Sequence, residues 1–145
     1  LVGPEMETVV GPMIHERGLE ALVFPGAPVT GEEKEACFAA ADVFIQTSRT
    51  EGMPMGILEA AAHGLCCAVT VGTRMADALH EYDAGLVCET NAEAVASMLA
   101  TLLMDPAAID RMGIRARQMA EEKYDWAQIG RTAVEKYAEI AEKAL

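Results

Sequence analysis

The chain has 145 residues, of which 52% are hydrophobic, so it can bury a substantial core and is too apolar to be disordered. Its formal charge is −12, with Asp and Glu spread along the chain, which disfavours nucleic acids and anionic membranes as partners. No apolar run approaches the roughly 20 residues of a membrane-spanning helix, so we expect no transmembrane segment. The four cysteines lack metal-site spacing, and three of them fall in apolar strand-like stretches, so we expect buried free thiols in a reducing cytoplasm.

The first part of the chain predicts two strands and two helices. Gly18 ends the first helix, and Pro12 should kink it. Thr30 and Glu33 have the spacing of a capping box, which predicts the start of the second helix. The predicted elements are a strand at 1–3, a helix over 5–17, a strand at 22–24 and a helix over 30–41.

The rest of the chain alternates short apolar strands with helices, which is typical of a parallel sheet. Asn91, Asp105 and Asp125 each precede a helical pattern and are expected to cap it. The predicted strands cover 43–47, 66–70 and 86–88, and the helices cover 53–63, 75–81, 92–104, 106–123 and 126–145. We therefore expect one α/β domain over 1–145, a Rossmann-like doubly wound parallel sheet of five strands with a helical C-terminal tail over 106–145.

The stretch from Ser48 to Gly64 joins a strand to a helix through a turn that contains glycine. Pro54 suits the first turn of this helix, because it has no N–H group and its φ is compatible with a helix start. Gly64 is expected to end the helix in a left-handed conformation. The turn and the helix N-terminus place free N–H groups at the carboxyl edge of the sheet, where phosphates bind.

Two carboxylates, Glu51 and Glu59, flank this helix N-terminus. A carboxylate repels phosphate but accepts hydrogen bonds from hydroxyl groups, so the combination fits a nucleotide-sugar, which has both groups. A glycosidase pair is the competing interpretation. Its carboxylates lie roughly 5–10 Å apart, whereas eight helical residues rise about 12 Å, so the spacing weakens this alternative without eliminating it.

The arrangement of Glu51, seven residues and Glu59, within Glu-Gly-Met-Pro and Leu-Glu-Ala, resembles the paired-glutamate motif of retaining GT-B glycosyltransferases of the group 1, family four type. The resemblance continues at Val23-Phe24-Pro25-Gly26, Gly85-Leu86-Val87 and Tyr124-Asp125-Trp126. It implies the C-terminal, donor-binding domain of an enzyme that transfers a sugar from a nucleotide-sugar donor to an acceptor. It also implies that no metal or other cofactor is used.

The resemblance gives each residue a role. Glu51 is the catalytic residue and lies against the transferred sugar, and Glu59 accepts hydrogen bonds from the ribose. The other expected substrate-binding residues face the sugar and diphosphate (Gly52, Met53, Pro54 and Met55) or lie near the base (Gly26 and Val29).

The family's domain begins with one further strand–helix unit, whose Arg and Lys neutralise the diphosphate. We expect that unit, and the N-terminal domain that binds the acceptor, to be missing from this chain, and we assign neither basic role to Arg17, Arg49 or Arg74. This segment alone should therefore be inactive. A nucleotide-sugar epimerase of GT-B shape and a non-catalytic nucleotide-sugar-binding module remain alternatives. The sequence does not specify the base, the sugar or the acceptor.

Overall fold

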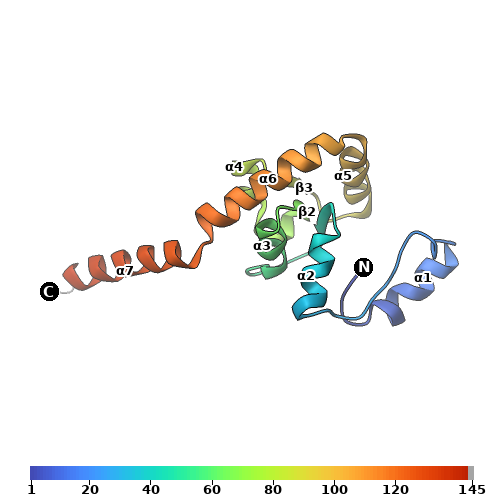
Figure 1. The fold of residues 1–145 in the computed structure, drawn as a ribbon, viewed down its shortest axis with the longest axis horizontal. Coiled ribbons are helices and arrows are strands. Elements are labelled where there is room, and N and C mark those ends of the chain that lie inside the picture. The colour runs from blue at the N-terminus through green and yellow to red at the C-terminus, as the bar shows by residue number, and fades with distance from the viewer. Residues whose placement is uncertain (144–145) are drawn as a thin grey trace. The chain divides into compact units, whose positions relative to one another are not determined.

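A computed structural model of the chain describes residues 1–143 (Figure 1). The chain divides into two compact units, one of residues Leu1–Ala40 and one that begins at Ala41. The expectation of a single domain over 1–145 stays a prediction.

The first unit is helical. A π-helical turn, η1 (Met6–Val10), leads into α1 (Gly11–Glu16), and α2 (Gly31–Ala39) follows after a long loop. Pro12 lies at the start of α1 and Gly18 ends the segment at a φ of +62°, as left-handed glycines do after helices. The predicted helix over 5–17 is confirmed, with a change of helix type near Pro12.

The two strands predicted in the first unit are wrong. Val2 forms only an isolated parallel bridge with Gly26. The 22–24 stretch turns instead of extending, because the N–H groups of Leu22 and Val23 both donate to the carbonyl of Leu19 at 2.9 Å. Two of the three apolar side chains in this stretch are exposed, Leu22 by 77% and Phe24 by 70%, and Val23 is half-buried.

The capping box predicted at the start of α2 is also wrong. Thr30 occupies the N-cap position, but its side chain makes no capping hydrogen bond. Gly31 has a φ of +56°, which is not a helical value, so the chain turns between Thr30 and Glu33. The reciprocal bonds of a capping box need a regular first turn at that point.

The second unit contains a sheet of three parallel strands in the order β1-β2-β3. The strands are β1 (Val43–Gln46), β2 (Cys66–Thr70) and β3 (Gly85–Cys88), with Phe44 opposite Cys67 and Ala68 opposite Leu86. Every residue of β2 is buried, as expected for the central strand of a parallel sheet. The predicted parallel sheet is confirmed, with three strands in place of five.

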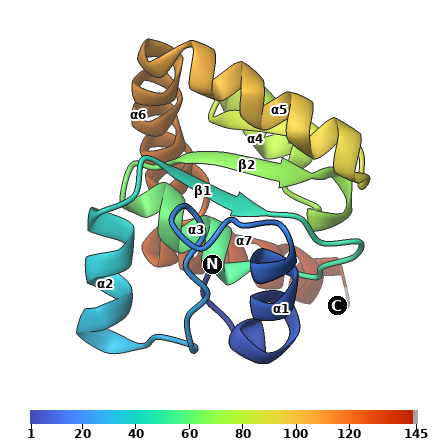
Figure 2. The ribbon, with the colours of Figure 1, turned by 90° about the vertical axis from the view of Figure 1, so that its right-hand side faces the viewer.

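Helices cover both faces of this sheet, as Figure 2 shows for α3 and α5 on either side of β1 and β2. On one face, Cys66 and Ala68 form a core cluster with Met98 and Leu102 of α5. The neighbouring Cys67 points the other way, and its thiol lies 3.8 Å from a backbone oxygen of α3. The helices are α3 (Met55–Ala62), α4 (Ala76–Tyr82), α5 (Ala92–Met104), α6 (Pro106–Lys123) and α7 (Trp126–Lys143). The Rossmann-like α/β class is confirmed.

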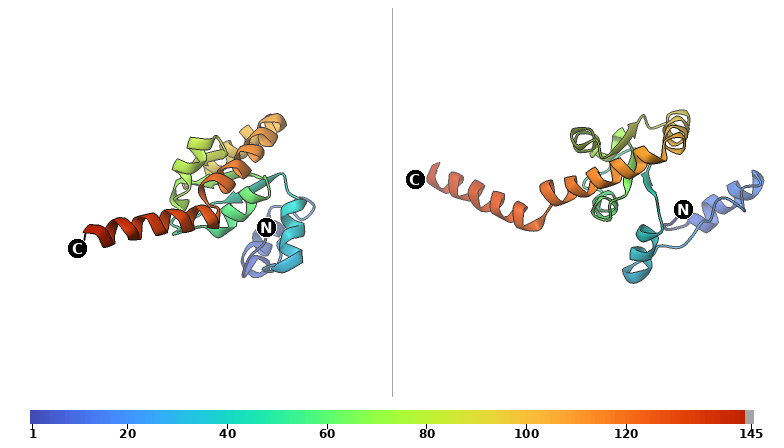
Figure 3. Two further views of the ribbon diagram at one scale, coloured as in Figure 1. Left: turned by 60° about the vertical axis from the view of Figure 1, so that its left-hand side comes forward. Right: turned by 45° about the horizontal axis from the view of Figure 1, so that its top comes forward.

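The predicted caps of the last three helices are confirmed. Asn91 accepts a hydrogen bond from the N–H of Ala94 at 2.9 Å, and Asp105 and Asp125 cap α6 and α7 in the same way. α7 follows α6 after a bend and extends away from the sheet (Figures 1 and 3). The predicted helical tail is therefore present, although its last two residues, 144 and 145, lie outside the described part of the chain.

Cys66 and Cys67 are buried free thiols, whereas Cys88 is half-buried and Cys37 is exposed. Among residues 1–143, no single helix is long and apolar enough to span a membrane. α5 and the α6–α7 stretch meet the criteria of length and hydropathy only when they are taken together, and a bend of 102° separates them.

Candidate functional site

The three strands end side by side, so the loops that follow them meet at the carboxyl edge of the sheet. The loop after β1 lies directly against the loop after β2. The N–H of Glu51 donates to the carbonyl of Gly72 at 2.9 Å, and Thr70 Oγ1 donates to the carbonyl of Ser48 at 2.7 Å. A side chain on Gly72 would collide with the carbonyl of Arg49, so only glycine permits this approach.

The Glu51 side chain is held at this edge by two hydrogen bonds. Its Oε1 accepts from Ser48 Oγ at 2.7 Å and from Gln46 Nε2 at 3.0 Å. Within residues 1–143, its second oxygen, Oε2, accepts no hydrogen bond. The half-buried carboxylate is thus anchored through one oxygen and can offer the other to a ligand.

Pro54 does not lie inside the first turn of α3, as the sequence predicted. It is the N-cap residue, with φ −79° and ψ 89°, and the helix begins one residue later at Met55. The ψ angle is not helical, so Pro54 turns the chain into the helix instead of continuing it. In the described part of the chain, the N–H groups of Gly52, Met53, Met55 and Gly56 donate no hydrogen bond. They form the group of free donors expected there.

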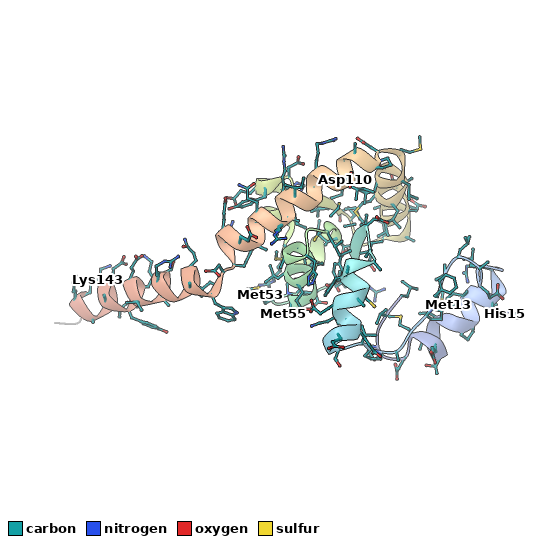
Figure 4. All side chains as sticks on the ribbon, in the orientation of Figure 1. Met13, His15, Met53, Met55, Asp110 and Lys143 are labelled. Carbon is teal, nitrogen blue, oxygen red and sulfur yellow. The ribbon has the colours of Figure 1, made fainter. Side chains whose placement is uncertain are left out.

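Glu59 lies four residues into α3 and lines a recess of about 540 Å³. Met53 and Met55 line the same recess; Figure 4 shows both near the start of α3. Its other wall comes from α6 and the start of α7, and includes Arg117, Tyr124 and Trp126. The structure therefore brings three of the predicted site residues, Met53, Met55 and Glu59, to one recess, and Glu51 does not line it.

His63 follows α3 and is its C-cap residue. Its Nδ1 donates to the carbonyl of Glu59 at 2.8 Å, since a carbonyl oxygen can only accept. Gly64, the next residue, has a φ of +79°, which confirms the predicted left-handed helix end. His63 thus interacts with the C-terminal end of α3, the helix that carries Glu59.

A second recess, of about 320 Å³, opens at the carboxyl ends of the strands. Thr47 follows β1, Thr70 ends β2 and Thr90 follows β3, and Arg49 adds a guanidinium group. Polar groups therefore surround this edge of the sheet on the side of α5.

Gly26 and Val29, which we expected near the base of a nucleotide, belong to the first unit. Gly26 donates to the carbonyl of Leu1 at 2.7 Å and accepts from the N–H of Gly3 at 3.1 Å. Val29 is half-buried in the loop before α2. Their contact with a base stays a prediction.

Sequence reasoning missed the two partners of the Glu51 side chain. Gln46 ends β1, and Ser48 follows two residues later, so period-two alternation places both on one side of the chain. That alternation, followed by a carboxylate three residues on, is the signal that could have identified them. Arg117 left no comparable signal, because it lies far from Glu59 in the sequence, and Tyr124 was part of the family resemblance without a role assigned to it.

Residues 1–119 match the family model described as Glycosyl transferases group 1. The chain belongs to this family. The resemblance of the paired-glutamate motif is therefore confirmed at the level of the family. No curated protein sequence matches the chain.

Solved structures of glycosyltransferases share the fold. HepE of Anabaena, in complex with UDP and glucose, matches with a TM-score of 0.81 and 20% identity over 96% of this chain and 40% of its own. Sucrose-phosphate synthase of Thermosynechococcus elongatus matches with a TM-score of 0.79 and 20% identity over 92% of this chain and 34% of its own. The chain thus spans well under half of these proteins, and identities this low establish the fold alone.

Proposed function

We propose that this chain is the donor-binding part of a retaining glycosyltransferase, which transfers a sugar from a nucleotide-sugar to an acceptor. The observation that carries the proposal is the anchored carboxylate of Glu51, next to the free N–H groups at the start of α3. Family membership supports the same assignment. The complex of HepE with UDP and glucose shows that a protein of this fold binds a nucleotide and a sugar.

In the proposed reaction, Glu51 acts on the transferred sugar. Positive charge develops on the sugar ring as its bond to the diphosphate breaks, and a fixed carboxylate stabilises that charge. The departing diphosphate is negative. The free N–H groups of Gly52, Met53, Met55 and Gly56 and the positive end of the α3 dipole can stabilise it without reorganising.

Glu59 accepts hydrogen bonds from the ribose hydroxyls of the donor in this proposal. Its recess offers apolar walls, with Met53 and Met55 on one side and Tyr124 on the other. Carboxylates bind vicinal hydroxyl groups through hydrogen bonds to charged acceptors, which are stronger than neutral ones. Glu59 therefore contributes to donor affinity more than to the chemical step.

The proposed enzyme uses no metal and acts in the cytoplasm. Its acceptor is bound by a domain outside this chain, and its diphosphate is also neutralised by basic residues outside it. The 145-residue segment alone is accordingly inactive, and measurable transfer by the purified segment would refute that part of the proposal.

The test is a panel of nucleotide-sugars incubated with the intact protein and candidate acceptors, with products identified by NMR. A new glycosidic bond of the same anomeric configuration as the donor supports the proposal, and addition of a chelator should not reduce its rate. An inverted bond overturns the retaining mechanism. A released sugar epimer identifies an epimerase, and binding without turnover identifies a binding module.

A further inference from the structure

We infer that Gln46 and Ser48 are positioning residues that hold the Glu51 carboxylate in its reactive orientation. The inference rests on the proposed function, because it assumes that Glu51 acts on the transferred sugar. Neither residue belongs to the paired-glutamate motif.

Both residues donate to the same oxygen of Glu51. Ser48 Oγ lies 2.7 Å and Gln46 Nε2 lies 3.0 Å from Oε1. Two donors on one oxygen restrict rotation of the carboxylate, and Gln46 Nε2 also lies 3.5 Å from Ser48 Oγ, so the three side chains form one connected group. The amide of Gln46 is oriented unambiguously, since a carboxylate only accepts hydrogen bonds and its partner must be the NH₂ group.

The two donors are themselves fixed by the sheet. Gln46 is the last residue of β1 and pairs with Val69 in the ladder. The carbonyl of Ser48 accepts a hydrogen bond from Thr70, whose own side chain is completely buried. The buried central strand therefore fixes the position of Ser48, and Ser48 in turn fixes the carboxylate of Glu51.

A second contact fixes the backbone of Glu51 itself. Its N–H donates to the carbonyl of Gly72. Thr73 Oγ1 in turn donates to the carbonyl of Thr70 at 2.9 Å, which holds the Gly72 turn in place. Substitution of the Ser48 side chain leaves all of these backbone bonds intact, so its effect reports on the carboxylate.

The experiment compares Gln46→Leu and Ser48→Ala with two matched controls in the intact protein. Gln118 donates to Glu122 at 2.9 Å on the exposed side of α6, and neither residue lines the recess, so Gln118→Leu breaks the same kind of bond away from the site. Ser97→Ala removes an exposed hydroxyl on α5. We expect each site variant to lower kcat about tenfold or more, because small misplacements of reacting groups are costly. The donor KM should change little, Ser48→Thr should restore kcat, and both controls should match the parent.

A double variant separates positioning from a structural role. If Gln46 acts through Glu51, then adding Gln46→Leu to Glu51→Gln lowers kcat no further. An equal fold-loss in both backgrounds overturns the inference, as does parental kcat in both Gln46→Leu and Ser48→Ala. If Glu51→Gln itself retains kcat, the proposed function of Glu51 fails instead. Circular dichroism identifies any variant that does not fold. If Gln46→Leu does not fold, the kcat of Ser48→Ala, which is the smaller change, tests the inference by itself.

Discussion

Gly113 of α6 lies against the carbonyl oxygen of Gly64, so closely that a methyl group on Gly113 would overlap with it. This contact brings the backbone of α6 onto the turn that ends α3. It also sets the separation of the two helices that form the walls of the Glu59 recess. Two glycines that are 49 positions apart in the sequence thus allow α6 to approach the end of α3, the helix that carries Glu59.

Replacement of Gly113 by Ala should destabilise the protein by about 1–3 kcal/mol, as overpacking does in a well-packed interior. Gly130 is the matched control, because it lies within α7 and no atom would contact its added methyl group. Gly130→Ala should leave stability unchanged or raise it by about 0.4–1 kcal/mol. Urea unfolding measures both changes. Equal stability of the two variants would show that α6 can shift away from Gly64.

Gly64 should not tolerate a branched side chain, because its φ is +79°. We expect Gly64→Val to cost at least about 1 kcal/mol, the penalty that an L-residue incurs in the left-handed region. There is room for a Cβ at this site, since its nearest neighbour would be 3.8 Å away. The Cβ itself therefore meets no clash, and the left-handed backbone accounts for the expected loss. A thermal unfolding midpoint equal to that of the parent would contradict it.

The sequence predicts the second unit of the fold better than the first, for physical reasons. β2 is apolar at consecutive positions and buried on both faces, so its composition alone marks a central strand. The 22–24 stretch is equally apolar, but its first residues turn back onto Leu19, and the chain after it forms only an isolated bridge with Val2. Asn91 and Asp105 cap helices through hydrogen bonds to residues three positions later, and such local bonds can be predicted from the sequence. The capping bond expected from Thr30 does not form, because it depends on the conformation of Gly31, which the sequence does not specify.

The candidate site shows the same division. The turn that carries Glu51 and the helix that carries Glu59 are local features of a continuous stretch, and both were predicted. The recess beside Glu59 was not, because its far wall is placed by the packing of α6 on α3. Strand alternation could have placed Gln46 and Ser48 on the same side as each other. It could not have shown that Gln46 donates to Glu51, because that bond depends on the path of the loop between them.

Two buried thiols should make the protein less stable at high pH. Burial raises the pKa of Cys66 from 9.0 to about 11, and burial together with the neighbouring Cys66 raises that of Cys67 from 9.0 to about 12. Above pH 9 the unfolded chain loses these protons while the folded protein keeps them. The free energy of unfolding therefore falls with rising pH, by up to about 1.4 kcal/mol per pH unit for each thiol.

Urea unfolding at pH 7, 9 and 10 tests this linkage. The loss of stability between pH 9 and 10 should be smaller in Cys67→Ala than in the parent, whatever the variant's stability at pH 7. Cys37→Ala is the control, since it removes a thiol that is exposed instead of buried. A parental pH dependence in Cys67→Ala would contradict the assignment.

Glu59→Ala should weaken donor binding and have a smaller effect on turnover. The ribose hydroxyls are the same before and during transfer, so the lost hydrogen bonds stabilise the ground state and the transition state equally. Hydrogen bonds to charged groups contribute roughly 1.5–3 kcal/mol, which corresponds to about a tenfold or greater rise in the donor KM. Steady-state kinetics of the intact protein measure the change, with Glu135→Ala on exposed α7 as the control. A fall in kcat at unchanged KM would assign Glu59 to the chemical step instead.

Glu51→Gln should have the opposite signature. The amide preserves the size of the side chain, and its oxygen can still accept from Ser48 and Gln46, so the loop should keep its conformation. Only the negative charge is lost, and that charge matters most when positive charge develops on the sugar. We therefore expect kcat to fall by about 100-fold, the scale on which removal of one electrostatic stabiliser acts, with little change in donor KM. Glu135→Gln is the matched control and should retain parental kinetics, and circular dichroism should show that both variants fold. If Glu51→Gln keeps its kcat, the carboxylate has no role in the reaction and the recess of Glu59 becomes the remaining part of the candidate site.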